Sequence, residues 1–137
     1  MEVDEEVKIL GVAPPLATVL LVEGERERAA SIARALVTAS YRVRQASDAA
    51  AAASILSRET PDLIAINLSL PDVDGLVLCS LVKEVLDVPI LVYGRTIPGR
   101  DAELAREVGA DELVDDSPSA EELVARLDGL RRRQRRR

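Results

Sequence analysis

Three short runs of mostly aliphatic residues recur along the chain, at residues 18–22, 62–67 and 89–93. Each run is bounded by polar, proline or glycine residues and is too short for a buried helix. An apolar run of this length is typical of a strand that is covered on both faces in a parallel sheet. These runs therefore limit the fold to one in which strands alternate with helices.

The segments between the runs have helical periodicity. In residues 25–40, Ala29, Ile32 and Leu36 recur at spacings of three and four, which indicates an amphipathic helix. Asp48 is suited to cap an alanine-rich helix that runs to about Glu59, because its carboxylate can accept from free backbone donors of the first turn. Further helices are predicted at residues 75–86, 99–108 and 119–131, and further strands at 41–46 and 112–114.

Five strands that alternate with five helices predict an α/β fold with a parallel sheet covered on both faces, since βαβ crossovers are almost always right-handed. The strand order 2-1-3-4-5, the doubly wound flavodoxin-like arrangement, is the common solution at this length. In such a sheet, functional groups gather where strands one, three and four end. We therefore expect Glu23, Gly24, Asn67 and Gly94 to lie near one another.

The length and composition fit one domain. The chain has 137 residues, of which 47% are apolar, and this is enough to bury a core. Residues 1–15 form an acidic leader, residues 16–130 the folded domain, and residues 131–137 an arginine-rich tail or the start of a linker. The net charge is −6, so the body is acidic, and a nucleic-acid-binding core is not expected.

The rarity of certain residues excludes several functions. The chain has no histidine, the commonest metal ligand, and neither Phe nor Trp for stacking on bases. Its one cysteine, Cys79, is in register with predicted core positions and indicates a buried hydrophobe. The acidic N-terminus is unlike a signal peptide, and the apolar run 16–22 is too short to cross a bilayer. We therefore expect a cytoplasmic protein without membrane contact.

Several motifs are specific in combination: Tyr41-Arg42-Val43, Leu70 to Gly75 (LPDVDG), Pro89-Ile90, Gly109 to Glu112 (GADE) and Glu122 to Arg126 (ELVAR). Together they resemble the receiver domains of bacterial response regulators, at the spacing of that family and over residues 16–130. The resemblance implies a two-component signalling role for this chain, with the flavodoxin-like fold already predicted.

The resemblance also implies a set of five chemical groups, and this chain departs from the family at each of their positions, although Glu23 keeps a carboxylate on a longer side chain. Receiver domains carry two acidic residues after strand one, an aspartate after strand three, a hydroxyl after strand four and a lysine after strand five. The acids hold Mg²⁺, which together with the lysine offsets the charge of the phosphoryl group. At these positions the chain has Glu23, Gly24, Asn67, Gly94 and Asp116.

Asparagine has no ionisable oxygen with which to attack a phosphoryl donor. We therefore predict an atypical receiver, or pseudo-receiver, with no catalytic residue, no cofactor and no bound metal. Leu113 stands where the family has an aromatic residue that changes orientation on activation, so the usual relay is predicted to be missing as well. Thr96 lies two residues beyond Gly94 and is the alternative source of the hydroxyl.

Other interpretations of the pocket remain open. A cluster of Glu23, Glu25, Asp115 and Asp116 can hold a hard cation or can simply be solvated. The vacated pocket can sense a small molecule, or the chain can be a weakly active phospho-receiver. Tyr93 is expected to be half-buried, either with its hydroxyl near the pocket or as a packing residue only.

The leading hypothesis is regulation, including transcriptional regulation, through protein contacts that do not require phosphorylation. In related receivers, helix four, strand five and helix five mediate dimerisation or partner contact. Here that face has mixed charge, suited to pairing across a two-fold axis, and comprises Leu104, Arg106, Glu107, Glu112, Glu122, Arg126 and Asp128. The arginines of 131–137 indicate a cationic helix end that continues into a linker, and both an attached effector domain and a free-standing single domain remain open. Nucleic acid is expected to meet only this tail or an attached domain.

Overall fold

One parallel sheet lies at the centre of the computed structural model, which describes residues 13–95, 97 and 99–135. Its five strands pair in the order β2-β1-β3-β4-β5. The predicted order is confirmed, with β2 at one edge. The strands are β1 (Thr18–Val22), β2 (Arg42–Ala46), β3 (Leu63–Asn67), β4 (Ile90–Tyr93) and β5 (Glu112–Val114).

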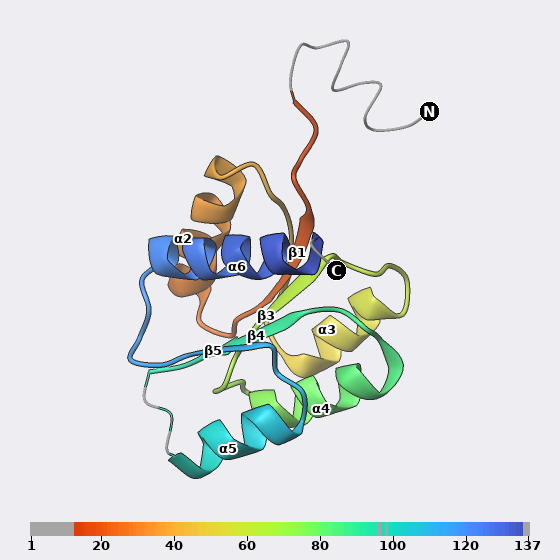
Figure 1. Ribbon diagram of the computed structural model, residues 1–137, viewed down its shortest axis with the longest axis vertical. Helices are drawn as coiled ribbons and strands as arrows, with labels where there is room; N and C mark the ends of the chain where they lie inside the picture. The colour runs from red at the N-terminus through yellow and green to blue at the C-terminus, as the bar shows by residue number, and fades with distance from the viewer. Residues whose placement is uncertain (1–12, 96, 98, 136–137) are drawn as a thin grey trace.

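Helices cover both faces of the sheet in three layers. Figure 1 shows α2 and α6 together on one face and α3, α4 and α5 on the other. The helices are α2 (Arg26–Thr38), α3 (Ala49–Leu56), α4 (Gly75–Val85), α5 (Gly99–Glu107) and α6 (Ala120–Arg135). Within the described part of the chain, each helix is too short or too polar to span a bilayer.

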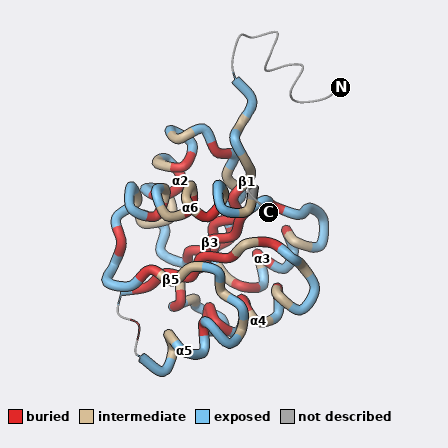
Figure 2. The backbone as a smooth tube through the Cα atoms, in the orientation of Figure 1, coloured by how far each residue is buried: buried red, intermediate tan, exposed pale blue. Residues whose placement is uncertain are grey.

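The inner strands alternate between two separate apolar cores, which explains why their sequences are apolar at every position. Val19 and Leu21 of β1 pack with α2 and α6, whereas Leu20 and Val22 pack with α3, α4 and α5. Figure 2 shows the buried strands between the more exposed helices. Cys79 is fully buried, as predicted, and burial raises the pKa of its thiol to about 11. This thiol is therefore part of the core.

Most predicted boundaries agree with the structure, but two helix ends differ. Asp48 caps α3 as predicted, with its Oδ1 accepting from Ala51 N at 2.7 Å. This helix ends at Leu56 rather than near Glu59, because the chain turns at Ser57 and Arg58. By contrast, α6 continues past the predicted end to Arg135, so the first residues of the predicted tail are helical.

Ion pairs to acidic residues account for the longer α6. Arg131 and Arg132 bind Asp128 one turn earlier, each at 2.9 Å. Arg133 reaches across to Glu112 on β5 at 2.6 Å. Pairs at spacings of three and four stabilise a helix, and the cross-link to β5 fixes its last turns against the sheet.

Gly75 lets α4 begin directly against the end of β3. A Cβ atom at this position would lie 2.4 Å from the carbonyl oxygen of Asn67 and 2.9 Å from the Cα of Leu68. The Gly75 amide also donates to the Leu68 carbonyl at 2.8 Å. This close approach closes the loop after β3 and holds Asn67 in place.

Candidate functional site

Strands β1 and β3 end beside a cleft of about 550 Å³ at the carboxyl edge of the sheet. The cleft contains three of the predicted site residues, Glu23, Gly24 and Asn67. The side chains and backbone that line it also include Glu25, Arg28, Ser69, Pro71 and Arg95. The topology therefore brings the expected strand ends together, and it adds two arginines that the sequence analysis did not consider.

Glu23 is the buried centre of the site, with only 3% of its surface exposed. Its Oε1 accepts hydrogen bonds from Asn67 Nδ2 at 2.8 Å and from the Tyr93 hydroxyl at 2.7 Å. Its Oε2 accepts from the Glu25 amide at 3.0 Å. Both carboxylate oxygens are thus occupied by donors from the chain itself, as a buried charge requires.

Asn67 uses both ends of its side-chain amide. The Nδ2 group donates to Glu23, and Oδ1 accepts from the Ser69 amide at 2.9 Å. An asparagine has one donor end and one acceptor end, and the two contacts satisfy one of each. Its orientation is therefore fixed by a carboxylate on one side and by the start of the loop on the other.

Arg28, in the first turns of α2, supplies the positive charge nearest to Glu23. Its Nε lies 3.4 Å from Glu23 Oε1, and the guanidinium carbon lies 5.5 Å from the centre of the Tyr93 ring. The Nη2 group donates to the Pro118 carbonyl at 3.1 Å. Nε itself is buried without a hydrogen bond, so it serves Glu23 as a counter-charge rather than as an aligned donor.

The sequence does contain a signal for Arg28. A helix that starts directly after an acidic residue at a strand end places the side chains of its first turn near that acid. Arg28, five positions after Glu23, lies in this first turn, so the helix brings it back toward Glu23. Glu25 caps the same helix, with its carboxylate accepting from Arg28 N at 3.2 Å.

Tyr93 is fully buried, so the predicted half-buried position is wrong. It ends an inner strand and packs in the core under α2 and α6. Its hydroxyl nevertheless points into the site, toward Glu23. Burial, followed by the adjacent negative charge of Glu23, raises the pKa of this phenol. Tyr93 therefore stays protonated and acts as a hydrogen-bond donor.

The two glycines of the site are closely packed. A Cβ atom on Gly24 would lie 2.9 Å from Cδ of Pro71 and 3.2 Å from the Ser47 carbonyl oxygen. On Gly94 it would lie 3.3 Å from Cγ1 of Ile97. Neither position has free room for a side chain. Thr96, the alternative hydroxyl, lies outside the described residues.

Asp115 and Asp116 do not join Glu23 and Glu25, so the predicted four-carboxylate cluster does not form. Asp115 Oδ1 accepts from the Ile97 amide at 2.8 Å and from the Asp116 amide at 2.6 Å. Asp116 has a left-handed backbone, with φ of 68°. Within residues 13–95, 97 and 99–135, no three acidic or cysteine side chains are grouped so that they could hold a metal ion.

The predicted interaction face on α5, β5 and α6 has much of its charge paired within the chain. Glu112 accepts from Arg126 and from Arg133. Burial raises the pKa of Glu112, but the two arginines outweigh it and leave that pKa lowered. Of the apolar residues on this face, Leu104 is 40% exposed, whereas Leu113, at the aromatic switch position, packs against the core.

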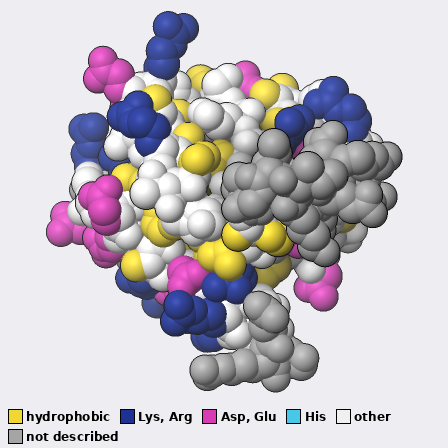
Figure 3. Space-filling view, turned by 90° about the horizontal axis from the view of Figure 1, so that it is seen from above, with side chains coloured by type: hydrophobic (Ala, Val, Ile, Leu, Met, Phe, Trp, Pro, Cys, Tyr) yellow, Lys and Arg dark blue, Asp and Glu magenta, His cyan; other side chains and the backbone are white. Residues whose placement is uncertain are grey.

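Asp128, on the same helix, is also paired internally. Its carboxylate accepts from the Tyr41 hydroxyl at 2.6 Å and binds Arg131 at 2.9 Å. These hydrogen bonds, with that from Tyr41 first, lower the pKa of Asp128. Seen from above, acidic and basic side chains of the molecule lie near one another around its rim (Figure 3). The side of the molecule seen in this view therefore carries charges of both signs.

The comparison with known families agrees with this fold. The family described as "Response regulator receiver domain" matches residues 19–128. The chain belongs to the response-regulator receiver domain family. It is thus a receiver domain of the kind used in two-component signalling.

Curated relatives in this family are longer proteins. The chain is 33% identical over 115 residues to the transcriptional regulatory protein BaeR of Escherichia coli, covering 84% of this chain and 48% of that protein. It is 34% identical over 120 residues to the response regulator MprA of Mycobacterium leprae, covering 84% and 51%. The chain therefore spans about half the length of the curated relatives it matches.

Solved structures confirm the fold. A CheY-like receiver domain from Methanospirillum hungatei aligns with a TM-score of 0.82 at 18% identity, covering 88% of this chain and 98% of that one. A putative response regulator from Chloroflexus aurantiacus aligns with a TM-score of 0.77 at 25% identity, covering 86% and 98%. The predicted flavodoxin-like receiver fold is therefore confirmed.

Proposed function

We propose that this receiver domain regulates through protein contacts without being phosphorylated, as a pseudo-receiver rather than an enzyme. The observation that carries the proposal is the Asn67 side chain at the end of β3. It presents an amide at the position of the family's acceptor aspartate, and both of its polar atoms are engaged by Glu23 and Ser69. An amide in these contacts offers no nucleophile for a phosphoryl donor.

The residues present do not fit the Mg²⁺ ion that the family implies. A hard cation needs several oxygen ligands. Gly24 provides no side-chain oxygen, and the oxygens of Glu23 already accept from Asn67, Tyr93 and the Glu25 amide. Arg28 supplies the compensating positive charge at 3.4 Å. This internal ion pair supports a site that needs no metal.

The hydroxyl and the lysine with which the family stabilises a transferred phosphoryl group are also replaced. Gly94 has no hydroxyl, and Asp116 places a carboxylate at the position of the family's lysine. The cations that do line the cleft are Arg28, which is bound to Glu23 and to the Pro118 carbonyl, and the exposed Arg95. These differences support the loss of phosphotransfer as a whole, beyond the loss of the acceptor alone.

A direct assay tests the proposal. The protein is incubated with Mg²⁺ and acetyl phosphate and its intact mass is measured; in parallel, amide shifts are recorded with Mg²⁺ and beryllofluoride. We expect no acyl-phosphate and no shift around Asn67. The variant Asn67→Asp restores the acceptor alone and should also remain unlabelled, because Gly24 and Asp116 are unchanged. A stoichiometric acyl-phosphate on the unaltered chain would refute the proposal and favour a weakly active phospho-receiver.

The open cleft supports a second candidate, a sensor of a small anion. Arg28 and Arg95 line the cleft beside the Ser69 backbone and side chain, and its volume of about 550 Å³ is within the range of ligand sites. Titration with inorganic phosphate and small phosphate esters tests this, with amide shifts near Ser69 and Arg95 as the readout. The variant Arg95→Ala should abolish such shifts, while Arg100→Ala, on α5, should not.

We also propose that the native protein connects this domain to an effector for transcriptional regulation, which fits relatives that are about twice as long, of which BaeR is named a transcriptional regulatory protein. The connection would follow α6. The sequence of the complete gene product tests it directly. Dimerisation through the α5–β5–α6 face stays a prediction, and the internal pairing of Glu112 and Asp128 leaves fewer free charges for it.

A further inference from the structure

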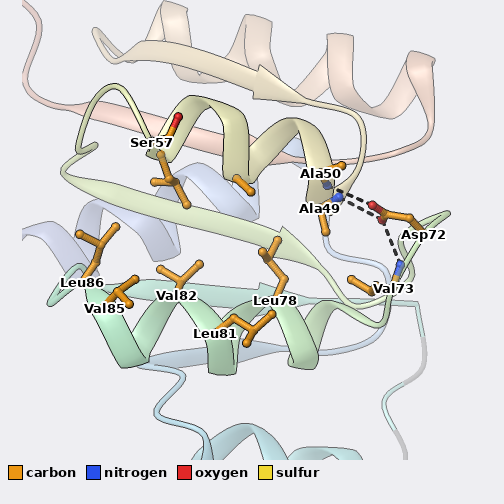
Figure 4. Close-up of a pocket in the computed structure, with 12 residues that line it drawn as sticks. Ala49, Ala50, Ser57, Asp72, Val73, Leu78, Leu81, Val82, Val85 and Leu86 are labelled. Atoms are coloured by element: carbon orange, nitrogen blue, oxygen red, sulfur yellow. Dashed lines mark hydrogen bonds between the residues drawn. The ribbon is translucent and has the colours of Figure 1, made fainter.

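An apolar groove of about 550 Å³ runs between α3 and α4, on the sheet face opposite α2 and α6. Figure 4 shows side chains of α4 directed toward α3 across this groove. Ser57 and Asp72 are its polar side chains. The groove is lined chiefly by Ala53, Leu56, Leu78, Leu81, Val82 and Val85.

An exposed apolar ridge runs along one wall of the groove. Val77, Leu81 and Val85 lie four residues apart on α4 and are 48%, 56% and 76% exposed. Val73, which also lines the groove, is 37% exposed. Single exposed aliphatic residues are ordinary, but a ridge joined to a groove forms a contiguous apolar surface of the kind that marks an interaction site.

Two other candidate surfaces among the described residues are more polar. Val37 on α2 is 61% exposed, but Arg34, one turn before it, and the adjacent Thr38 line a depression that also contains Glu121. On the α5–β5–α6 face, Glu112 and Asp128 are bound to arginines of the same chain. The groove and ridge are therefore the part of the described surface where a partner would bury the most exposed apolar side chains.

We propose that the groove binds a second copy of this chain, with the ridge of each copy seated in the groove of the other about a two-fold axis. The ridge and the groove run side by side along α4, so one rotation satisfies both at once. Such an isologous contact needs a surface that complements itself. Leu81, in the middle of the ridge, would lie nearest to the axis.

The charges at the two ends of the groove match this arrangement. Asp72 lies at the end where α3 and α4 begin, and the exposed Arg58 follows Ser57 at the end where α3 stops. An antiparallel pairing brings Asp72 of one copy to the Arg58 end of the other. Hydrogen bonds from the Ala49, Ala50 and Val73 amides, with Ala49 first, lower the pKa of Asp72 and keep it charged.

Salt separates this contact from one on the charged α5–β5–α6 face. Each copy carries a net charge of −6, and Glu84 on α4 is also exposed, so two copies repel at low ionic strength. Salt screens that repulsion and leaves the apolar contact intact. Because the contact is chiefly apolar and the Asp72 and Arg58 charges lie only at its ends, the groove dimer should hold as salt rises, whereas a dimer held mainly by cross-subunit ion pairs should loosen.

This inference rests on the proposed function, since it names the partner through which a pseudo-receiver would act. The test is sedimentation equilibrium of the whole chain at low and high salt, from micromolar to millimolar concentration. Leu81→Ser should weaken dimerisation by about tenfold or more, because it removes a large apolar side chain from the contact. Val37→Ser, a similarly exposed residue on the opposite face, should leave it unchanged.

A covalent probe provides a second measurement. Under mild oxidation, Leu81→Cys should form a disulfide-linked dimer faster than Val37→Cys, and the native Cys79 is buried and does not compete. A strict monomer at millimolar concentration, equal effects of the two serine variants, or equal cross-linking rates would overturn the proposal and leave the groove to a different protein or a small apolar ligand. The acyl-phosphate assay is independent of these results, so the two proposals can fail separately.

Discussion

The carboxyl-edge site and the α3–α4 groove differ in how their surfaces are satisfied. At the carboxyl edge, Glu23 is met by donors from Asn67, Tyr93 and Glu25 and by the charge of Arg28. In the groove, aliphatic side chains such as Leu81 and Val85 face solvent. The polar groups of the carboxyl-edge site are thus satisfied within the chain, whereas the apolar side chains of the groove are not, which is why we propose the groove as the contact surface.

The largest effect is expected from Gly75→Ala, which disturbs both regions at once. Gly75 starts α4 and touches the Asn67 backbone, and the added Cβ would lie 2.4 Å from a carbonyl oxygen. We expect the free energy of unfolding to fall by about 3 kcal/mol, the upper range for overpacking. Chemical denaturation measures it. Gly99→Ala is the control, because a Cβ there meets no atom within 4 Å; equal losses would contradict the explanation.

Removal of the internal cation tests whether the carboxyl-edge site is held by its ion pair. Loss of one partner of a buried pair costs about 3 to 5 kcal/mol, and the partial exposure of Arg28 reduces the loss expected for Arg28→Gln to about 2 kcal/mol. In a Glu23→Gln background the same change should cost less, because no buried charge is left unpaired. Arg26→Gln, an exposed neighbour on α2, should cost little. If this double-mutant cycle shows no coupling between Arg28 and Glu23, the contribution of Arg28 comes from its packing against Tyr93 instead.

The charged face on β5 and α6 gives a smaller, pH-dependent effect. The native pKa values of Asp128 and Glu112 are lowered, so their stabilisation is complete above the unfolded values near 4 and is lost as pH falls through the native values. We expect a loss of about 1 kcal/mol for these partly exposed pairs. Thermal unfolding at pH 6 and pH 3 measures it, and Asp128→Asn should reduce the difference. An unchanged pH profile in that variant would count against the role of Asp128.

The smallest effect is expected for Val85→Ser, which tests whether the exposed side chains beside the groove contribute to the stability of the monomer. Val85 is 76% exposed, so this change should alter the stability of the monomer by no more than about 0.5 kcal/mol. Leu78→Ala, from the buried wall of the same groove, should cost about 3 kcal/mol by comparison. Denaturation at low protein concentration measures both. A large loss for Val85→Ser would mean that the ridge supports the fold rather than a contact.

The fold was largely predictable because its signals are local. The apolar runs marked the inner strands, Asp48 marked the start of α3, and the glycines at 75 and 109 marked a helix start and a helix end; Gly109 has a φ of +95°. Of the two helix ends that differed, the end of α6 depends on a partner distant in sequence. The extension of α6 to Arg135 rests on Glu112 across the sheet, which no helical periodicity records.

The site was predictable in its positions but not in its contacts. Strand order alone placed Glu23 and Asn67 together. The role of Arg28 depends on how α2 turns over the end of β1, and the burial of Tyr93 depends on packing beneath α2 and α6. The expected acid cluster is not found among the described residues, and Asp115 instead accepts from backbone amides of the β5–α6 and β4–α5 loops. The sequence shows which side chains are charged, but which of them pair depends on the tertiary structure.

The tight fit of Gly24 has an evolutionary consequence. A side chain there collides with the ring of Pro71, at 2.9 Å from Cβ to Cδ. An acidic residue here, as the family has, would therefore require Pro71 to move as well as Gly24 to change. Under the proposed loss of phosphotransfer, a single substitution at position 24 would be strained before it could supply a metal ligand, so the two positions would have to change together.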